Sequence, residues 1–266
     1  MNLIEAIILG ITQGLTEFIP VSSSGHLVLM HKLLGVTDSG LAFDVALHVG
    51  TLLALVIFFY KDIWQLILGL LGKNDKSRLA LLLVVATIPA VVVGVLLESA
   101  AESAFRSVRL VSIDLIIAAI LMLLAERFAK RRKRHTKLPD TSTKQALTIG
   151  IAQAAAIVPG ISRSGATITA GLFTGMDRVA ATRFSFLLAM PITFGAIIKV
   201  LSGNDAISQF SGNADIFLVG IITAFVSGVL AIKFLLNYLS KHSLAVFAYY
   251  RILIGLVAIL LVSIYE

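Results

Sequence analysis

One short segment of this chain gathers polar side chains that are rare inside a bilayer. It reads Pro159-Gly160-Ile161-Ser162-Arg163-Ser164-Gly165-Ala166-Thr167 and lies between apolar stretches. An arginine at membrane depth costs at least about 2.5–3.5 kcal/mol on insertion scales, so we expect it to meet a partner there. Hydroxyl groups and glycine amides around a guanidinium are typical of a site for an oxygen-rich anion, with phosphate as the first candidate. The sequence therefore predicts a phosphate-binding set that comprises Ser162, Arg163, Ser164, Gly165 and Thr167.

A second polar segment, near the N-terminus, carries a carboxylate and an imidazole. Gln13 and Glu17 stand at i and i+4, which places both side chains on one face of a helix. Pro20 ends that helix, and a polar elbow follows with the sequence Val21-Ser22-Ser23-Ser24-Gly25-His26. Because a buried carboxylate is costly unless it meets a cation, Glu17 is either a catalytic or metal-binding group or a structural partner of Arg163. His26 is likewise either a catalytic group or a packing histidine.

Brought together, the two segments contain the groups that phosphoryl transfer needs. Arg163 would neutralise phosphate charge, and Glu17 with Gln13 is the candidate site for a divalent cation, Mg²⁺ or Ca²⁺. The predicted catalytic residues are Glu17, His26, Ser23 and Arg163, and Ser22 joins the phosphate-binding set. The chain has no cysteine and no zinc-type ligand spacing, which excludes thiolate chemistry and a zinc-finger-like site.

The composition places this chemistry in a membrane. Hydrophobic residues make up 58% of the 266 positions, charged residues make up 14%, and the mean hydropathy is +0.97. Soluble domains are nearer half apolar and a quarter charged. A large soluble core would need helices with polar faces, and runs such as 79–97 and 110–124 have almost none. We therefore predict a polytopic membrane protein that has the lipid bilayer as its surroundings.

The apolar segments predict a single all-α integral membrane domain over residues 1–266. Six of them are long enough to cross a bilayer, at 41–60, 78–97, 110–128, 183–201, 215–236 and 245–264. Two others, 2–34 and 144–175, break at a proline or glycine beside serines and then resume. This pattern is typical of re-entrant helical hairpins, which enter a membrane partway and return.

The two predicted hairpins are copies of each other. Without a gap, Gly10, Ile11, Gln13, Ser22, Ser24 and Gly25 recur as Gly150, Ile151, Gln153, Ser162, Ser164 and Gly165. A weaker likeness relates the segment 88–96 to the segment 222–230. Each copy, about 1–128 and 144–266, holds one hairpin and three spans, and the odd number of crossings inverts the second copy. Inverted repeats with broken helices form their site near the midplane, where the hairpin tips meet.

Basic residues predict the orientation of the chain. The hydrophilic loop 129–143 and the helix end before it contain Arg127, Lys130, Arg131, Arg132, Lys133, Arg134 and Lys137. Beside an apolar helix such a run is far more often a cytoplasmic retention signal than a nucleic-acid patch, so we expect no nucleic-acid partner. If the first hairpin enters from outside, most other lysines and arginines also fall inside. Both termini are then predicted to lie outside.

Three motifs carry a resemblance to a known family. They are Gln-x-x-x-Glu at 13–17, Pro-Val-Ser-Ser-Ser-Gly-His at 20–26 and Pro-Gly-x-Ser-Arg-Ser-x-x-Thr at 159–167. They closely resemble the signature segments of the undecaprenyl-diphosphate phosphatase, or bacitracin-resistance, family, and the likeness extends over essentially the whole chain. The resemblance implies a metal-assisted enzyme of the bacterial inner membrane that removes the terminal phosphate of undecaprenyl diphosphate, with its site open to the outer side. It also implies a role in recycling the carrier lipid of peptidoglycan synthesis, and hence in bacitracin resistance.

By motif position, the resemblance implies metal or acid–base chemistry at Gln13 and Glu17 and an elbow that includes Ser23 and His26. It implies a diphosphate site made by Ser162, Arg163 and Thr167. Many members of the family have glutamate where this chain has Gln13. Since a neutral amide can ligate a metal or donate a hydrogen bond but is not a base, Glu17 or His26 must act as the base here.

The sequence leaves the nucleophile and the class of protein open. Either Ser23 or a water molecule activated by His26 or Glu17 would attack the terminal phosphorus. The rival class is a transporter or flippase for a polyprenyl-phosphate lipid, because inverted repeats with broken helices are typical of secondary transporters. A homodimer is also compatible with the sequence.

Overall fold

The computed structural model describes residues 1–36, 41–72, 74, 76–104, 108–202 and 212–265. These residues form helices and one isolated β-bridge, between Thr136 and Met176, as the all-α prediction requires. The helices are α1 (Leu3–Phe18), α2 (Ser23–Leu34), α3 (Leu41–Phe58), α4 (Tyr60–Leu70), α5 (Ser77–Ala104), α6 (Val108–Arg131), α7 (Thr143–Ala155), α8 (Arg163–Phe173), α9 (Arg178–Leu201), α11 (Ala214–Leu239) and α12 (Ala245–Tyr265), with a short 3-10 turn η1 (Leu138–Asp140).

Five helices, α5, α6, α9, α11 and α12, are long and apolar enough to cross a membrane. The span predicted at 41–60 differs from a single straight helix. It ends at Phe58, and the chain continues as α4 after a bend of 78°. The bend comes where polar residues begin, and Asp62 of α4 accepts hydrogen bonds of 2.9 Å from Arg183 of α9. If the bent pair α3–α4 is counted as one span, the number of candidate spans rises to six.

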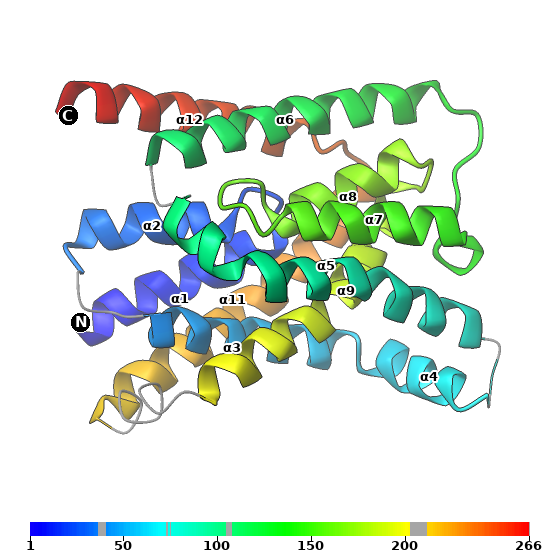
Figure 1. Cartoon of the computed structure of the whole chain (residues 1–266), viewed down its shortest axis with the longest axis horizontal. Helices are drawn as coiled ribbons and strands as arrows, with labels where there is room; N and C mark the ends of the chain where they lie inside the picture. The colour runs from blue at the N-terminus through cyan, green and yellow to red at the C-terminus, as the bar shows by residue number, and fades with distance from the viewer. Residues whose placement is uncertain (37–40, 73, 75, 105–107, 203–211, 266) are drawn as a thin grey trace.

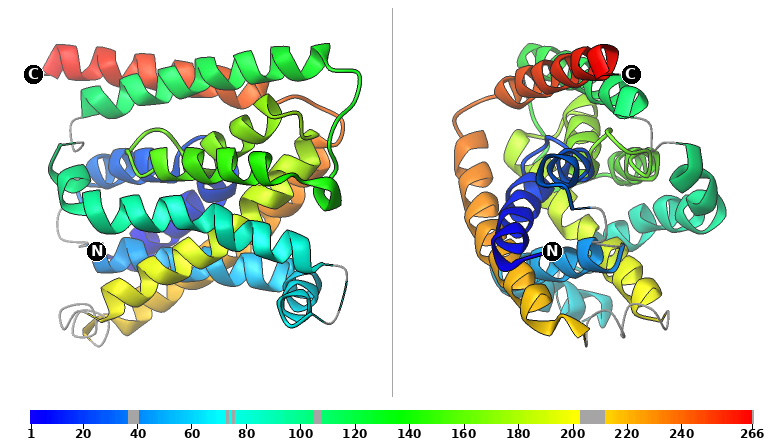
Figure 2. Two further views of the ribbon diagram at one scale, coloured as in Figure 1. Left: turned by 45° about the vertical axis from the view of Figure 1, so that its right-hand side comes forward. Right: turned by 90° about the vertical axis from the view of Figure 1, so that its left-hand side faces the viewer.

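Both predicted hairpins are present as pairs of packed helices. α1 and α2 form the first, and α7 and α8 form the second. Their open ends lie at opposite ends of the molecule, and their breaks point toward each other in the middle (Figure 1). Both chain termini lie at the open end of the first hairpin, and the loop between α6 and α7 lies at the other end (Figures 1 and 2). The fold therefore brings the two polar segments together halfway along the bundle.

Each hairpin packs its first helix against a long helix from the other half of the chain. α1 lies along α11, and α7 lies along α5, while α6 and α12 pack together. The close approach depends on glycine, because a Cβ added at Gly10 would lie 2.7 Å from the carbonyl oxygen of Gly220. A Cβ added at Gly150 would overlap the carbonyl group of Ala86. Small residues that allow such backbone contact are typical of helix packing in membranes.

Candidate active site

The two hairpins break in the same way. In each, a serine precedes the returning helix and caps it, with the Oγ of Ser22 accepting from the amide of Gly25 at 3.4 Å and the Oγ of Ser162 accepting from the amide of Gly165 at 3.1 Å. Among the described residues, Ser22 and Ser162 alone have a positive φ without being glycine, at 77° and 72°. Such backbone costs of the order of 1–3 kcal/mol and clusters at functional sites. Both serines are therefore caps that set the shape of the breaks.

The second helix of each hairpin begins at a residue that the sequence predicts to be catalytic. α2 starts at Ser23 and α8 starts at Arg163, so His26 lies in the first turn of α2 and not in an extended elbow. The amides in the first turn of a helix lack intrahelical partners, and the helix dipole is positive there. The two breaks therefore bring two helix N-termini toward the centre of the fold, where an anion is favoured.

Glu17 joins the first hairpin to the second. Its Oε1 accepts from Nη2 of Arg163 at 2.7 Å, although the two residues are 146 positions apart. Its Oε2 accepts from the Ser23 hydroxyl at 2.6 Å and from the Gln13 amide at 3.0 Å. Only 8% of the Glu17 side chain is exposed, so these donors compensate a carboxylate that is otherwise costly to bury. The prediction that the two motifs meet is confirmed by these distances.

His48, on α3, completes this group and was missed by the sequence reasoning. Its Nδ1 lies 3.0 Å from Nε2 of Gln13 and 3.9 Å from Oε2 of Glu17. Since the Gln13 amide donates one hydrogen to Glu17, its second hydrogen points to His48, whose Nδ1 must then be the acceptor. A histidine inside an apolar span is itself a signal of a polar neighbour at that depth.

His26 faces α12 and has no hydrogen bond to Glu17 or Ser23. Its Nδ1 lies 2.8 Å from the carbonyl oxygen of Ser22, so the ring proton sits on Nδ1. Its Nε2 lies 2.7 Å from the hydroxyl of Tyr250, and the two rings stack with centroids 5.6 Å apart. Tyr250 was not anticipated from the sequence. A catalytic role for His26 stays a prediction, and its reactive nitrogen already has a hydroxyl donor.

Two members of the predicted phosphate-binding set, Arg163 and Thr167, differ in whether their polar groups are already hydrogen-bonded. Arg163 has one guanidinium nitrogen, Nη1, that is buried and has no partner, so it can still receive an anion. Thr167 lies in the second turn of α8, and its buried hydroxyl contacts Ser185 at 2.6 Å and the Arg163 carbonyl at 2.7 Å. Direct contact between Thr167 and a substrate stays a prediction, because in this structure the hydroxyl braces α8 against α9.

The residues around Glu17 fit a divalent cation only in part. Among the residues that the structure describes, no three His, Asp or Glu side chains converge as metal ligands. One carboxylate, Glu17, is present, and the buried Oε1 of Gln13 has no partner. Mg²⁺ is commonly bound by one or two carboxylates together with substrate phosphates and water. This donor set therefore fits an ion that shares its ligands with a phosphate substrate.

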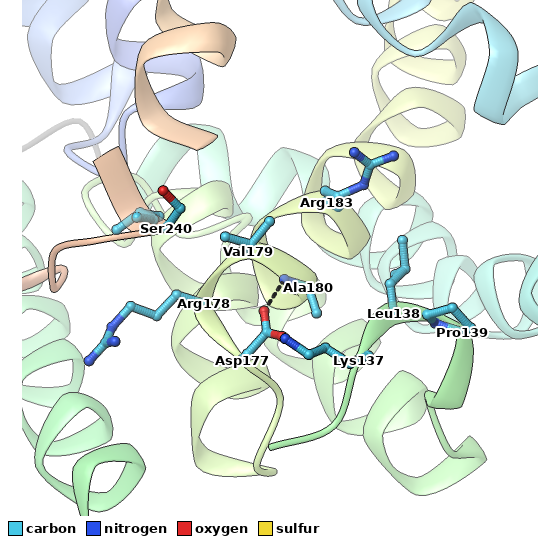
Figure 3. Close-up of a pocket in the computed structure, with 10 residues that line it drawn as sticks. Lys137, Leu138, Pro139, Asp177, Arg178, Val179, Ala180, Arg183 and Ser240 are labelled. Carbon is cyan, nitrogen blue, oxygen red and sulfur yellow. Dashed lines mark hydrogen bonds and ion pairs between the residues drawn. The ribbon is translucent and has the colours of Figure 1, made fainter. Parts of the chain in front are cut away.

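A separate hollow of about 510 Å³ lies near the loop that joins α6 to α7, and lysine and arginine side chains line it (Figure 3). Each of these cations already has a carboxylate partner: Lys137 pairs with Asp177 at 2.8 Å, Arg178 with Glu126 at 2.6 Å and Arg183 with Asp62 at 2.9 Å. The hydrogen bond and charge of Asp177 raise the pKa of Lys137 above its usual value. Among the described residues that line the hollow, each lysine and arginine is therefore already paired, unlike Arg163 at the hairpin breaks, whose Nη1 has no partner.

Comparison with known proteins gives consistent matches over nearly the whole chain. The family model described as bacitracin resistance protein BacA matches residues 6–257. A protein of Moorella thermoacetica is 44% identical over 257 residues, which cover 96% of each chain. A protein of Desulforudis audaxviator is 45% identical over 264 residues, covering 98% of each, and one of Idiomarina loihiensis is 42% identical, covering 98% of this chain and 99% of its own. All three relatives are named undecaprenyl-diphosphatase.

Proposed function

The chain belongs to the bacitracin resistance protein BacA family, and from that membership we propose that it hydrolyses undecaprenyl diphosphate to undecaprenyl phosphate and inorganic phosphate. Its family and its apolar helices make it a multi-pass membrane protein. The observation that carries the proposal is the meeting of Arg163, Glu17 and Ser23 at the breaks of two hairpins. A cation, a carboxylate and a hydroxyl within hydrogen-bond distance are the groups that phosphate transfer to water requires.

The proposal assigns phosphate binding to the second hairpin. Arg163 would bind the diphosphate through its unpartnered Nη1 while Nη2 stays on Glu17. Ser162 and Ser164 would shape the break, with the Gly165 amide donating to Ser162. The amides of Arg163 and Ser164, at the start of α8, would be left for phosphate oxygens. A bound Mg²⁺ or Ca²⁺ would be held by Glu17 and Gln13 and would neutralise charge on the phosphates. Every group named here comes from one chain, and the homodimer stays a prediction.

The first hairpin would supply the attacking group. The Ser23 hydroxyl already donates to Oε2 of Glu17, which is the geometry of a nucleophile beside its base. In that route Glu17 takes the proton, the Ser23 oxygen bonds to the terminal phosphorus, and undecaprenyl phosphate leaves as the bridging bond breaks. Water then hydrolyses the phosphoserine. The alternative is direct attack by a water molecule that Glu17 or His26 deprotonates.

Replacing Ser23 with alanine distinguishes these two routes. If Ser23 is the nucleophile, we expect Ser23→Ala to lower kcat by at least about 10²-fold, the usual scale for a lost nucleophile or proton transfer. Ser24→Ala is the matched control, since Ser24 is exposed and its hydroxyl contacts only that of Ser22, at 3.3 Å. Phosphate release is measured for both variants under identical conditions. A Ser23→Ala enzyme as active as Ser24→Ala would exclude the covalent route and leave direct attack by water.

The architecture we propose for this reaction is a pair of inverted repeats with six spans and two re-entrant hairpins. Two contacts support it: Gly10 packs on Gly220, and the corresponding Gly150 packs on Ala86 in the other half. The equivalent caps Ser22 and Ser162 support it as well. With the basic loop 129–143 in the cytoplasm, the first hairpin would open to the outer side of the bacterial inner membrane. Reporter fusions that place residue 1 or residue 266 in the cytoplasm would contradict this orientation.

This location would let the enzyme return carrier lipid to cell-wall synthesis and so confer resistance to bacitracin. A transporter or flippase for the same lipid is the second candidate, because a midplane site between broken helices would suit it equally. The two functions differ in chemistry. A phosphatase dissolved in detergent still releases phosphate from the lipid, because hydrolysis needs no second compartment. Transport needs a membrane that separates two solutions.

A phosphate-release assay on the purified protein tests this proposal. We expect undecaprenyl diphosphate to yield inorganic phosphate in detergent, with turnover falling to background in a chelator and returning with Mg²⁺ or Ca²⁺. Undecaprenyl monophosphate serves as the control substrate and should release none. Tight binding of the diphosphate without any phosphate release at saturating Mg²⁺ and Ca²⁺ would favour the transporter. Full turnover in the chelator would refute the metal at Glu17 and leave the hydrolase assignment standing.

A further inference from the structure

One buried arginine, Arg251 on α12, contacts both hairpin breaks. Its side chain is 0% exposed. Nη2 donates to the carbonyl oxygens of Gly160 at 2.9 Å and Ile161 at 2.8 Å, in the second break. Nη1 reaches the carbonyl oxygen of Pro20 in the first break, at 3.4 Å. A single guanidinium therefore contacts two segments that lie in different halves of the chain.

We propose that Arg251 is a positioning residue that holds the two breaks against each other. Glu17 and Ser23 lie beside the first break, and Arg163 begins the helix after the second. The distance between the catalytic carboxylate and the phosphate-binding guanidinium therefore depends on how the breaks are aligned. The kinetic consequence of this inference rests on the proposed phosphatase function, but the clamp itself does not.

The chemistry of the contact requires arginine. A helix break leaves carbonyl groups without intrahelical donors, and at membrane depth each unsatisfied group is costly. Five N–H donors in a planar fork can serve three carbonyl oxygens at once, which the compact ammonium of lysine cannot do in a fixed geometry. Among the described residues Arg251 has no ion pair, so these carbonyl dipoles are the compensation for its buried charge.

Gly165 provides the space that this clamp occupies. A Cβ added at Gly165 would lie 2.6 Å from Nη1 of Arg251, which is closer than side chains approach. The corresponding glycine of the first hairpin, Gly25, has no such neighbour, since the nearest atom to its added Cβ is the Ser22 Oγ at 3.4 Å. Gly165→Ala therefore displaces the guanidinium without removing its charge. Gly25→Ala is the matched substitution at the equivalent position.

Amide hydrogen exchange tests the clamp without any use of activity. We expect Arg251→Lys and Gly165→Ala to accelerate exchange at both breaks, residues 19–26 and 157–166, by at least about ten-fold over the wild-type protein, while Gly25→Ala leaves the second break unchanged. Simultaneous loosening of two distant segments is the signature, because one residue holds both. If Arg251→Lys exchanges at the wild-type rate at either break, the clamp is refuted. Because Arg251→Lys and Gly165→Ala are both milder changes, they test the clamp even if the more severe variant Arg251→Ala does not fold.

Kinetics then separate positioning from a general loss of stability. We expect Arg251→Ala to lower kcat by about 10²-fold, with a smaller change in KM, and added guanidinium ion to restore part of that loss. The kcat of Arg251→Lys should lie between those of the wild-type protein and Arg251→Ala. The kcat of Gly25→Ala should stay within about three-fold of wild type. Guanidinium that restores nothing in folded Arg251→Ala would refute the positioning role. If the wild-type protein releases no phosphate, the proposed function fails, and the exchange experiment still decides the clamp.

Discussion

Arg163→Ala is expected to lower kcat/KM for phosphate release by about 10³-fold. An arginine that neutralises a transferring phosphate is worth about 10³–10⁵ in rate, and a single preorganised donor about 10²–10³. Arg163 has one guanidinium nitrogen on Glu17 and a second that is buried and unpartnered, so it is arranged to receive an anion. Arg163→Lys keeps the charge but loses the fork, and should recover only part of the activity.

The chain offers a matched control for this variant. Arg178 makes the same kind of contact with Glu126, through two nitrogens at 2.8 and 2.6 Å, at the end of the molecule away from the hairpin breaks. Arg178→Ala removes another partly buried arginine–glutamate pair, one with two hydrogen bonds where Arg163 has one, so it reports what loss of such a pair does to folding. We expect Arg178→Ala to unfold at a lower temperature but to keep near-normal turnover per folded molecule. If the two alanine variants lose activity equally, the assignment of Arg163 to the phosphate is refuted.

Glu17→Gln should be the second most damaging substitution, with kcat lowered by about 10³-fold. The amide keeps the shape of the carboxylate, but it neither accepts a proton nor binds a divalent cation strongly. It also loses the charge that holds Arg163, and breaking a buried pair is commonly worth about 3–5 kcal/mol of stability when one charge is left unpaired. A bound phosphate would supply a new negative charge to Arg163, so the damage should fall mainly on turnover and less on substrate binding.

Glu126→Gln is the corresponding control, because Glu126 is buried, pairs with Arg178 and accepts from the amide of Leu244 at 2.8 Å. It should cost stability at the end of the bundle near the loop between α6 and α7 and leave turnover near normal. Activity and metal dependence are measured together, by phosphate release over a range of Mg²⁺ concentrations. If Glu17→Gln keeps its turnover and its Mg²⁺ requirement, Glu17 is neither base nor metal ligand. Its role would then be the structural pair with Arg163.

The helices and their breaks were predictable because they depend on neighbours in sequence. α1 ends at Phe18, just before Pro20, and α7 ends at Ala155, about one turn before Pro159-Gly160. In both hairpins a serine followed by glycine three positions later caps the returning helix. The all-α prediction is confirmed in the described residues, and each predicted hairpin is present as a pair of packed helices, whereas their re-entrant insertion stays a prediction. The bend between α3 and α4 was not predicted, and the contact of Asp62 with Arg183 beyond it joins residues that no local pattern relates, so the span at 41–60 stays a prediction.

By itself the sequence determined the chemical groups of the site, the segments in which the helices break and the sequence likeness between the two hairpins. The tertiary structure alone decided which groups meet. It paired Glu17 with Arg163, brought His48 to Gln13 and Tyr250 to His26, and set Arg251 between both breaks. The physical reason is the range of each interaction. Caps and breaks arise from atoms a few residues apart, whereas contacts among α3, α12 and the hairpins follow from how whole helices pack.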